Sequence, residues 1–583
     1  MQKVESVAGA PSSLPVSYIL LAAFVVHAPL LLMKLPLKSY DANFHIFFAS
    51  HYLHHWFDPW NPKWYAGFSQ TTYPPLPQQW VALVSHVTGL EMAYMAVQMA
   101  AILFLVIGVY RFAQLWVDRR AAALAACASV LLGSEAFLVY SAGQLSTTFA
   151  APLYLNSLPF LYEWIRHNRW RSFFKGSALA VAAAAAHHAT LLFGSVLFAI
   201  PVFLLALQHG SDRPRGGGSG VVLRTLLAVV LIGAAVAIVL LPFWIALIRY
   251  PVTQTPIPHP SRANYILNPE WGLNYFLVPY GALILAIPFI LVRGVATPRL
   301  RPLLLGFWVT MLIGLGGTTP FGRLLLGRAF EVLTMERFTY WATLLALPFV
   351  GLLAKELIDR FHSPAMVGLT IAAGLTCALA VGWSTFHPAE AADFKVNSVA
   401  SWLDRDGHDR YRYITLGFGN KISRLARFTD AGSVDGEWNS GRRLPELTAH
   451  GAGALTSSKY FGKQGIDALS AILQHADRYG LKWVFLRDPY YEPLLVFAGW
   501  RKVDDLEDRT ITVWGKEDCP PAMPLNARDM PPPWQGLMWG ILPVGSSIVA
   551  LLLLLIPDRK RAAQSAAEPS RNREDLVLGR MIS

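Results

Sequence analysis

Long apolar runs separated by short polar connections make up most of this sequence. They extend from residue 16 to residue 383 and return once near the C-terminus. A helix needs about 20 apolar residues to cross a bilayer, so the pattern predicts an α-helical polytopic membrane protein with about 12 spans. The predicted spans are 16–33, 91–112, 121–140, 148–164, 176–190, 192–208, 225–247, 276–292, 303–317, 339–354, 364–383 and 535–556. The pair 176–190 and 192–208 also fits one kinked helix or a re-entrant pair.

One polar stretch, residues 384–533, interrupts the apolar pattern. Charged side chains make up 39 of its 150 residues, whereas they make up 47 of the other 433. Apolar periodicity predicts helices at 393–404 and 466–480. β-Branched and aromatic residues predict three strands, at Tyr411–Leu416, Trp483–Arg487 and Thr510–Trp514. We therefore expect a small α/β domain that folds by itself outside the apolar region.

The distribution of Lys and Arg predicts the orientation of the chain. Cytoplasmic loops of membrane proteins carry an excess of these residues. With the N-terminus in the cytoplasm, 22 basic residues fall inside and eight fall outside, not counting 384–533. Both termini are then cytoplasmic, and 384–533 is extracytoplasmic together with the loops 34–79, 249–275 and 318–338. Basic residues beside apolar spans usually set topology, so the net charge of +12 does not predict nucleic-acid binding.

These predictions divide the chain into four parts. The parts are a multispanning domain at 1–383, the extracytoplasmic α/β domain at 384–533, a last transmembrane helix at 534–557 and a basic tail at 558–583. Lys34 follows the first apolar run without a small-residue cleavage site, so we expect an uncleaved span there. The tail is polar and is expected to be disordered in the cytoplasm.

The first outer loop, residues 34–79, is rich in aromatic residues, acids and histidines. The stretch Asp41–Phe57 contains neither Pro nor Gly, which favours an amphipathic helix along the membrane surface. Asp58–Pro62 then ends the helix, and Tyr73-Pro74-Pro75 stiffens the return to the bilayer. The loop 249–275 contains five prolines and is expected to be extended.

Carboxylates at the outer face are the candidates for acid–base chemistry there. The predicted topology places seven of them at that face: Asp41, Asp58, Glu91, Glu135, Glu270, Glu331 and Glu336. Asp41 is the leading candidate because it begins the predicted surface helix, with His45 four residues later on the same helix face. Asp41 could accept a proton from a sugar hydroxyl or share a metal with His45. Alternatively, Asp41 only caps the helix N-terminus.

Other polar residues suggest substrate contacts at the outer face. His188 lies in the outer half of an Ala-rich span, where an ionisable side chain is either functional or hydrogen-bonded to a neighbouring helix. Arg337 is a candidate clamp for a lipid phosphate, or it forms an interfacial ion pair with the adjacent Glu336. Two further arginines compete for the anion-binding role, Arg323 and Arg328.

Aromatic residues of the outer loops are candidate platforms for stacking of sugar rings, although most of the 19 Trp and 21 Tyr fit an interfacial belt. The tryptophans with most weight are Trp56, Trp60, Trp64 and Trp271. The sequence contains no Walker A, GxSxG or HExxH motif. The three cysteines show no metal-type spacing, and no disulfide framework is expected.

Short motifs of the first outer loop resemble a known signature. They are Asp41-Ala-Asn-Phe-His45, Trp60-Asn-Pro62, Tyr65-Ala-Gly67 and Tyr73-Pro-Pro75. Together they resemble the first loop of bacterial membrane proteins described as 6-pyruvoyl-tetrahydropterin synthase-related. That group is similar to the GT-C glycosyltransferases, which have many spans, a first outer loop with an essential Asp and often a C-terminal extracytoplasmic domain. The resemblance covers most of the membrane region, includes Met335-Glu-Arg-Phe338, and is weak in 384–533.

The resemblance implies a function and roles for particular residues. The enzyme would lie in the bacterial inner membrane, in contact with membrane lipids. It would transfer a hexosyl or pentosyl group from a polyprenyl-phosphate donor to a glycan, lipid or protein acceptor on the extracytoplasmic side. Asp41 would be the general base or a metal-organising carboxylate, and Arg337 would contact the lipid phosphate. The other implied substrate contacts are His45, Glu336, His188, Trp60 and Tyr73. Ala42 follows Asp41 where several GT-C families have a second acid, so a divalent metal, with Asp41 and His45 as ligands, is a candidate cofactor that the pattern does not require.

Two other classes of function fit parts of the pattern. A transporter or flippase of a lipid-linked or polyanionic substrate suits the many spans and the histidines within one of them. However, polar residues gather at the outer face, and no inverted repeat is evident. A non-catalytic polysaccharide assembly factor would use the outer loops only to bind glycan. A transporter needs polar residues that line both halves of the membrane, whereas an enzyme needs only an outer cavity.

Overall fold

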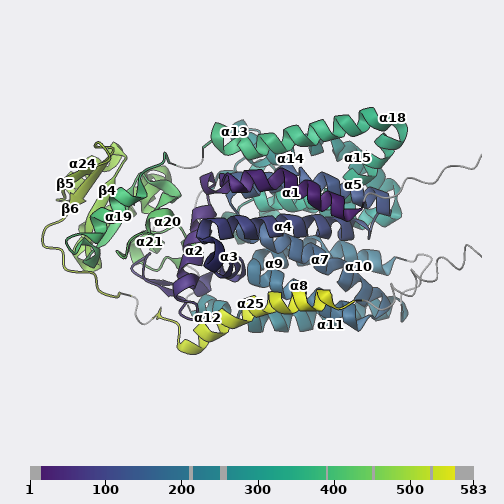
Figure 1. The fold of residues 1–583 in the computed structure, drawn as a ribbon, viewed down its shortest axis with the longest axis horizontal. Coiled ribbons are helices and arrows are strands. Elements are labelled where there is room, and N and C mark those ends of the chain that lie inside the picture. The colour runs from purple at the N-terminus through teal and green to yellow at the C-terminus, as the bar shows by residue number, and fades with distance from the viewer. Residues whose placement is uncertain are drawn as a thin grey trace, which may run out of the picture.

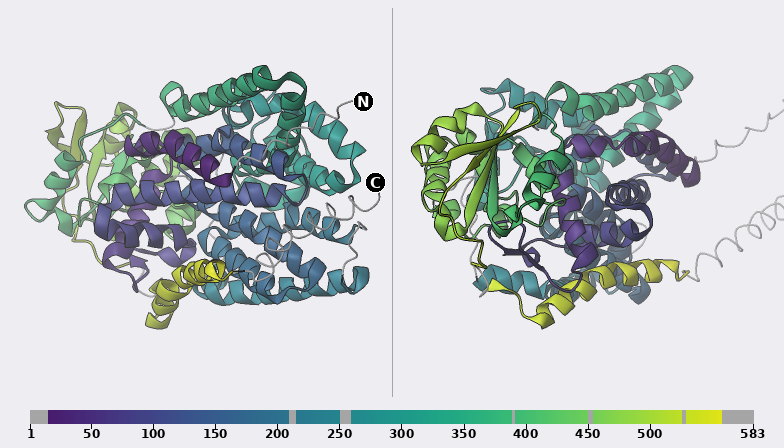
Figure 2. Two further views of the ribbon diagram at one scale, coloured as in Figure 1. Left: turned by 45° about the vertical axis from the view of Figure 1, so that its right-hand side comes forward. Right: turned by 60° about the vertical axis from the view of Figure 1, so that its left-hand side comes forward.

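The computed structural model describes residues 15–208, 215–249, 259–388, 391–449, 454–525 and 529–557. Long helices form a bundle, and a smaller unit that contains a sheet covers one end of the bundle (Figure 1). Figure 2 shows the same arrangement from two other sides. The loop 249–275 was predicted to be extended, but its described part contains short helical stretches at Pro260–Arg262, Pro269–Gly272 and Leu273–Leu277, because proline fits the first turn of a helix. Residues 250–258 of this loop and the predicted tail 558–583 lie outside the described residues.

Among the described residues, seven helices are long and apolar enough to cross a membrane, beside the 17-residue α1. The helices of the bundle and its loops are α1 (Val16–Leu32), α2 (Ala42–His54), α3 (Leu76–Thr88), α4 (Leu90–Ala113), α5 (Arg119–Val130), α6 (Gly133–Ala136), α7 (Leu145–His167), α8 (Trp170–Ala186), α9 (His188–Leu197), α10 (Ala199–Leu207), α11 (Gly217–Val239), α12 (Leu241–Arg249), α13 (Pro269–Gly272), α14 (Val278–Tyr280), α15 (Ile287–Ala296), α16 (Arg301–Gly314), α17 (Phe321–Leu326), α18 (Glu336–Phe386) and α25 (Pro533–Leu555). Two π-helical stretches, Phe137–Ala142 and Leu273–Leu277, follow α6 and α13. The count of twelve spans stays a prediction.

Two of the predicted span pairs have informative connections. Predicted spans 339–354 and 364–383 form α18, which is interrupted at His362, where φ is 51°. Pro364 lacks a backbone N–H and disfavours helical geometry before it, which accounts for a break at this position. Residues 176–208 form α8, α9 and α10, and His187 is the extended residue that separates α8 from α9. The break therefore lies at His187, four residues before the predicted boundary at residue 191, and the choice between two spans, a kinked helix and a re-entrant pair stays a prediction.

The predicted helix of the first outer loop is confirmed as α2, but its environment differs from the prediction. α2 runs across the end of the bundle, between the bundle and the α/β unit (Figure 1). Ile46 and Ala49 pack into the core of the bundle, whereas Phe44 and Phe47 pack into a core on the other side. An amphipathic surface helix would keep one polar face in water. Because α2 is apolar on both faces, it joins two packed layers instead.

The α/β unit contains a four-stranded sheet in the order β3-β4-β6-β5. β3 and β4 are parallel, and the other two pairs are antiparallel. Its elements are α19 (Val396–Asp404), β3 (Arg412–Leu416), α20 (Ile422–Leu425), α21 (Pro445–Ala449), α22 (Gly462–Gln474), α23 (Ala476–Tyr479), β4 (Leu481–Leu486), α24 (Glu492–Phe497), β5 (Arg501–Leu506) and β6 (Ile511–Gly515). The sequence did not predict the edge strand β5, because most of its residues are charged. In the structure, most of its side chains are exposed.

Alternate residues of β4 face two different cores. Trp483 and Phe485 pack with α19 on one face of the sheet. Val484 and Leu486 pack on the other face with α22 and with the aromatic side chains of the first outer loop. This alternation is the period-two pattern of a strand that is buried on both sides. The first loop therefore completes one of the two cores of the α/β unit.

Backbone hydrogen bonds strengthen this junction. Ser433 N donates to Lys63 O at 2.8 Å, and Ala66 N donates to Ser433 O at 3.1 Å. Within the first loop, β1 (Trp60–Asn61) pairs with β2 (Phe68–Ser69) in an antiparallel hairpin. We therefore expect 384–533 to depend on the first loop for its stability, in contrast to the independent folding that its composition predicts.

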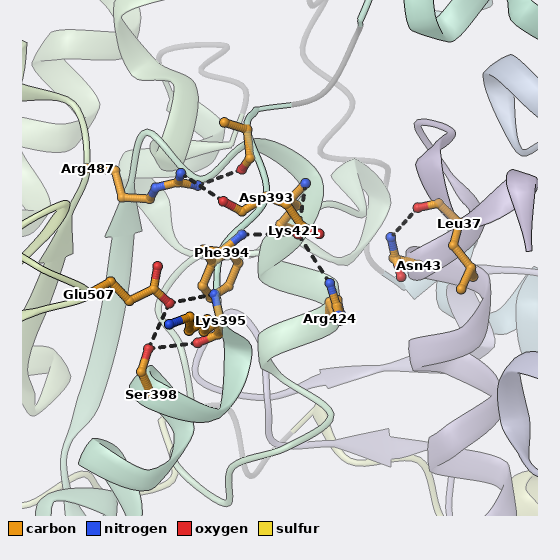
Figure 3. Close-up of polar contacts among 11 residues, drawn as sticks. Leu37, Asn43, Asp393, Phe394, Lys395, Ser398, Lys421, Arg424, Arg487 and Glu507 are labelled. Atoms are coloured by element: carbon orange, nitrogen blue, oxygen red, sulfur yellow. Dashed lines mark hydrogen bonds and ion pairs between the residues drawn. The ribbon is translucent and has the colours of Figure 1, made fainter.

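Ion pairs fix the place where the chain enters the α/β unit after α18. Asp393 accepts hydrogen bonds from Lys421 at 3.1 Å and from Arg424 at 3.2 Å (Figure 3). Arg487, just after β4, donates to the carbonyl oxygens of Ala392 at 2.7 Å and Asp393 at 3.2 Å. These contacts tie the entering segment to β4 and to α20, which lies beside α2.

Candidate active site

The backbone around Asp41 is bound to the segment that follows α6. Asp41 N donates to Ala142 O at 2.9 Å, and Tyr40 N donates to Ser141 O at 3.3 Å. Gly143 makes this approach possible, because its φ is +72° and a Cβ there would lie 2.2 Å from Ser39 Oγ. Glycine is the residue that adopts this conformation without strain. The bundle thereby sets the position of Asp41 through main-chain contacts.

The Asp41 carboxylate is not a helix cap. Asp41 precedes α2, yet its side chain makes no capping hydrogen bond, and among the described residues it has no other hydrogen-bond partner. Burial raises the pKa of Asp41 to about 7, with Arg337 opposing the rise and Glu336 adding to it. A carboxylate that titrates near neutral pH without structural partners has the properties expected of a general base.

His45 is neutral and oriented by Gln78. The Nε2 amide of Gln78 lies 2.8 Å from His45 Nδ1, so Nδ1 accepts and the proton resides on Nε2. Burial, together with the positive charge of Arg337, lowers the pKa of His45 to about 3. His45 can therefore donate a hydrogen bond from Nε2 to a substrate oxygen, but it does not carry a charge near neutral pH.

Gln144 joins the two residues that begin α18. Its Nε2 donates to Glu336 Oε1 at 2.7 Å, and its Oε1 accepts from Arg337 Nε at 3.2 Å. Asp41 and Arg337 make no ion pair within 4.0 Å, although the charge of Arg337 acts on the Asp41 carboxyl. The structure thus brings Asp41, His45, Glu336 and Arg337 together and leaves the carboxylate and the guanidinium separated.

Three further histidines face the charge of Arg337. The charge acts on His187, His188 and His259. His187 Nδ1 lies 2.8 Å from Thr190 Oγ1, while the ring of His188 packs 4.8 Å from that of Phe243. Burial lowers the pKa of His259, and the charge of Glu336 opposes this shift. His188 therefore lies within the electrostatic range of the site, and its role in substrate binding stays a prediction.

The aromatic residues of the first loop are packed rather than open. Trp60 is 8% exposed, and a Cβ on Gly67 would lie 2.4 Å from its ring. Trp64 is fully buried in the core that the first loop shares with the α/β unit. Tyr73 lies 6.0 Å from the ring of His45 and 4.6 Å from that of Trp438. Both tryptophan rings are thus packed within the protein, and stacking of a sugar on Trp60 stays a prediction.

The remaining outer carboxylates have separate roles or positions. Glu91 pairs with Lys34 at 2.8 Å, and Glu331 pairs with Arg323 at 3.2 Å. Asp58 Oδ1 accepts a hydrogen bond from Trp60 N at 3.0 Å. The Glu270 side chain is exposed, and Glu135 is buried beside Tyr340. Of the seven candidates, Asp41 and Glu336 are the two within the range of Arg337.

The residues present do not form a convincing divalent-metal site. Among the described residues, no group of three or more His, Cys, Asp and Glu side chains is arranged to hold a metal ion. His45 Nδ1 already faces the Gln78 amide, and Asn43 Nδ2 donates to Leu37 O at 3.3 Å (Figure 3). Metal sites in proteins are usually built from several convergent ligands with ordered partners. The described side chains around Asp41 therefore do not fit a divalent metal ion.

Three site residues were not predicted from the sequence: Gln78, Gln144 and Gly143. Gln78 follows Tyr73-Pro74-Pro75 in a stretch assigned to the loop, and Gln144 lies between two predicted spans. A single glutamine carries no motif, so only its presence between apolar segments could have drawn attention to it. The role of Gly143 depends on a close approach to Ser39 and Asp41 that is visible only in three dimensions.

No protein-family model matches this chain, and none of the curated proteins matches it. Its structure resembles the oligosaccharyltransferase of Archaeoglobus fulgidus in complex with Zn and sulfate, with a TM-score of 0.50 and 12% identity over 82% of this chain and 69% of that one. It also resembles the arabinofuranosyltransferase AftD from Mycobacteria, with a TM-score of 0.50 and 15% identity over 86% of this chain and 40% of AftD. ArnT from Cupriavidus metallidurans, bound to undecaprenyl phosphate, is 14% identical over 87% of this chain and 98% of ArnT, with a TM-score of 0.47.

These comparisons concern the fold. The similar structures are GT-C glycosyltransferases, so a GT-C-like, mostly helical membrane fold is confirmed in this coarse form. The chain spans about two fifths of the length of AftD. The resemblance to 6-pyruvoyl-tetrahydropterin synthase-related proteins finds no support in them.

Proposed function

We propose that this chain is a membrane glycosyltransferase that moves a sugar from a polyprenyl-phosphate donor to an acceptor at the face covered by the α/β unit. The observation that carries the proposal is the placement of Asp41 and Arg337. The first loop supplies a carboxylate without a structural partner, and the start of α18 supplies a guanidinium whose charge acts on it without forming an ion pair. A base and a cation arranged in this way would act on the two reacting groups of a transfer reaction.

The proposed reaction is a displacement at the anomeric carbon. A hydroxyl oxygen of the acceptor forms a bond to that carbon, and the bond from the carbon to the phosphate oxygen breaks. Asp41 takes the hydroxyl proton, and the electron pair of the broken bond leaves with the polyprenyl phosphate. Arg337 stabilises the negative charge that develops on this phosphate. The reaction balances with these groups alone.

The neighbouring residues would hold this geometry. Gln144 holds Arg337 through Nε, so the terminal nitrogens of the guanidinium would bind the phosphate. Glu336 balances the charge of Arg337 on the side of Gln144. Neutral His45 would donate from Nε2 to a hydroxyl of the sugar, because Gln78 occupies Nδ1. Each of these contacts prepares the site before substrate binds.

The α/β unit would select the acceptor, because it contacts the first loop beside the proposed base. Trp438 packs against Tyr73, whose ring lies next to His45, and Trp438 Nε1 donates to Thr72 Oγ1 at 3.0 Å. The unit therefore reaches the first loop within two side chains of the proposed base. An acceptor that approaches from outside the membrane would meet this junction first.

The proposal can be tested with labelled lipid donors. The purified chain in lipid nanodiscs is incubated with undecaprenyl-phosphate sugars and a glycan or lipid extract, and release of undecaprenyl phosphate is measured. We expect release by the wild type, and a loss of at least about tenfold in Arg337→Gln. Arg328→Gln serves as the control, because it removes the same charge at an exposed position. Movement of intact labelled lipid across the bilayer without cleavage would instead support a transporter.

A further inference from the structure

A basic cavity lies beside the candidate active site, between the loop that precedes α13 and the segment around α17. Its volume is about 460 Å³, and its lining includes Arg262, Asn264, Thr318, Arg323 and Phe330. Among the described residues, two guanidinium groups and no carboxylate line the cavity. Outside this lining, Glu331 pairs with Arg323 at 3.2 Å, and the charges of Glu331 and Glu336 act on Arg262.

Close backbone contacts fix the walls of this cavity. Gly317 N donates to Ala263 O at 3.1 Å, and Tyr265 N donates to Thr318 Oγ1 at 2.9 Å. Gly316 has a φ of +58°, and a Cβ there would lie 2.5 Å from Ser261 O. Only glycine allows this approach without displacement. The two loops therefore form one preformed surface.

The lining chemistry suits a phosphate group. Arginine binds phosphate oxygens through several N–H groups in a planar fork, and two arginines provide charge on both sides of such a ligand. Arg262 is half-buried and Arg323 is exposed, so one holds a fixed position and the other can adjust to a ligand. The cation of Arg323 lies 5.5 Å from the ring of Phe330, which forms part of the lining.

Exposed apolar side chains flank the cavity on both sides. Ile266 and Leu267, in the loop that precedes α13, are 78% and 77% exposed. Leu324, on α17, is 75% exposed. Apolar side chains beside a basic cavity, in a chain with membrane-spanning helices, are placed to contact lipid tails. A free phosphate would make no use of these residues.

We propose that this cavity binds the head group of a phosphate-bearing lipid, separately from the phosphate contact proposed for Arg337. The phosphate lies between Arg262 and Arg323, and the lipid tail runs along Ile266, Leu267 and Leu324. The inference rests on the cavity and its flanks, and it does not require that the chain transfers sugars. The lipid is either an anionic phospholipid or a polyprenyl phosphate, because the two share this chemistry.

The cavity is connected to the start of α18. Arg262 Nη1 donates to Leu333 O at 2.9 Å, and Met335 N donates to Ser261 Oγ at 2.9 Å. These bonds hold the segment that leads into Glu336 and Arg337. A lipid bound between Arg262 and Arg323 therefore contacts the same loop that positions the candidate active site.

Lipid binding to the purified full-length chain tests the proposal. Native mass spectrometry in a neutral detergent would count bound molecules during titration with phosphatidylglycerol, with undecaprenyl phosphate and with inorganic phosphate. We expect at least one of the lipids to bind, and Arg323→Gln to weaken that binding by about tenfold. Arg328→Gln, which removes the same charge outside the lining, should leave it unchanged. The lipid that binds identifies the source of the phosphate.

Two more variants separate this site from others. Glu331→Gln removes the ion-pair partner of Arg323, so Arg323 becomes available to the phosphate and lipid binding should strengthen. If the Arg323–Glu331 pair had only a structural role, the substitution would not strengthen lipid binding. In an Arg337→Gln background, Arg323→Gln should still weaken lipid binding, because the two proposed phosphate contacts are separate. Equal weakening by Arg323→Gln and Arg328→Gln would indicate diffuse surface attraction and overturn the proposal. Binding of inorganic phosphate alone, or of no probe, would overturn it as well.

Discussion

Gln144 accepts a hydrogen bond from Nε of Arg337 at 3.2 Å. The same amide donates to Glu336 at 2.7 Å, and the residue before it, Gly143, gives the backbone of Asp41 its place. Residues 141–144 therefore position both the carboxylate and the guanidinium of the candidate site. This short segment connects parts of the site that are far apart in the sequence.

Replacing Gln144 tests this positioning role. Gln144→Leu keeps the side-chain size but removes both hydrogen bonds, and hydrogen bonds to charged groups are worth about 1.5–3 kcal/mol. We therefore expect a loss of roughly 10- to 100-fold in kcat/KM for sugar transfer. Thr147→Val removes a weaker bond to Gln144, of 3.3 Å, and should have little effect. Equal activity of both variants would exclude the positioning role.

The pH dependence of transfer reports the state of Asp41. Burial raises the pKa of Asp41 to about 7, so the base is protonated below this pH and ionised above it. kcat/KM should rise by about tenfold per pH unit up to about pH 7 and then level off. Arg337 lowers and Glu336 raises the pKa of Asp41. Arg337→Gln should therefore move the inflection to higher pH, and Glu336→Gln should move it to lower pH.

An inflection near pH 4, unaffected by either variant, would show that Asp41 is an ordinary exposed carboxylate or that another group is the base. The comparison is informative even when activity is low, because the position of the inflection is independent of the maximum rate. The two variants shift it in opposite directions, so a general loss of stability cannot imitate the expected result.

Gly143→Ala should displace Asp41. The added Cβ would lie 2.2 Å from Ser39 Oγ and 2.6 Å from Ala42 N, so the backbone at the start of α2 has to move. We expect a loss of activity of about 100-fold or more, since misplacement by about 1 Å can have this effect. Gly216→Ala is a matched control, because Gly216 has a φ of +76° in the same left-handed region and the nearest described atom lies 3.6 Å from the added Cβ. Its activity should stay near the wild type, whereas a comparable loss would point to backbone strain alone.

The shared core predicts that the α/β unit needs the first loop. Trp64→Ala removes a buried side chain from that core and should destabilise the unit by about 3–5 kcal/mol. Limited proteolysis should then cleave within 391–525 at lower protease concentration. Trp170→Ala, at a half-exposed tryptophan of α8, is the control. Unchanged proteolysis in Trp64→Ala would support the independent domain predicted from composition.

Local patterns in the sequence predicted individual elements well. The helix after Asp41 and the strands around Ile414, Val484 and Val513 carry strong residue preferences and appear in the structure. The sequence also identified Asp41, His45 and Arg337 as candidates, and these lie together. Charged β5 was missed because its edge position, rather than its composition, makes it a strand.

Contacts between segments that are far apart in the chain could not be predicted from the sequence. The apolar residues of α2 predicted burial on one side, but the second buried face depends on the α/β unit. Trp60 and Trp64 have the composition of sugar platforms, and only their packing shows that they are covered. Gln144 and Gly143 act through close contacts with α18 and the first loop, which no local pattern encodes.

Sugar transfer by Asp41→Asn tests the central claim most directly. Asn keeps the shape of the side chain, and Asp41 makes no capping bond that the change could remove. Burial raises the pKa of Asp41 from 3.8 to about 7, so the folded state loses stability as the pH rises through this range, and at pH 8 the loss is complete. Asp41→Asn should therefore be at least as stable as the wild type at pH 8.

Measured at pH 8 with an undecaprenyl-phosphate sugar, transfer by Asp41→Asn should fall by about 10²- to 10⁴-fold, as expected for the loss of a general base. Asp58→Asn, at an acid that caps a turn of the same loop, should retain most of its activity. A normally folded Asp41→Asn protein with wild-type turnover would contradict the account.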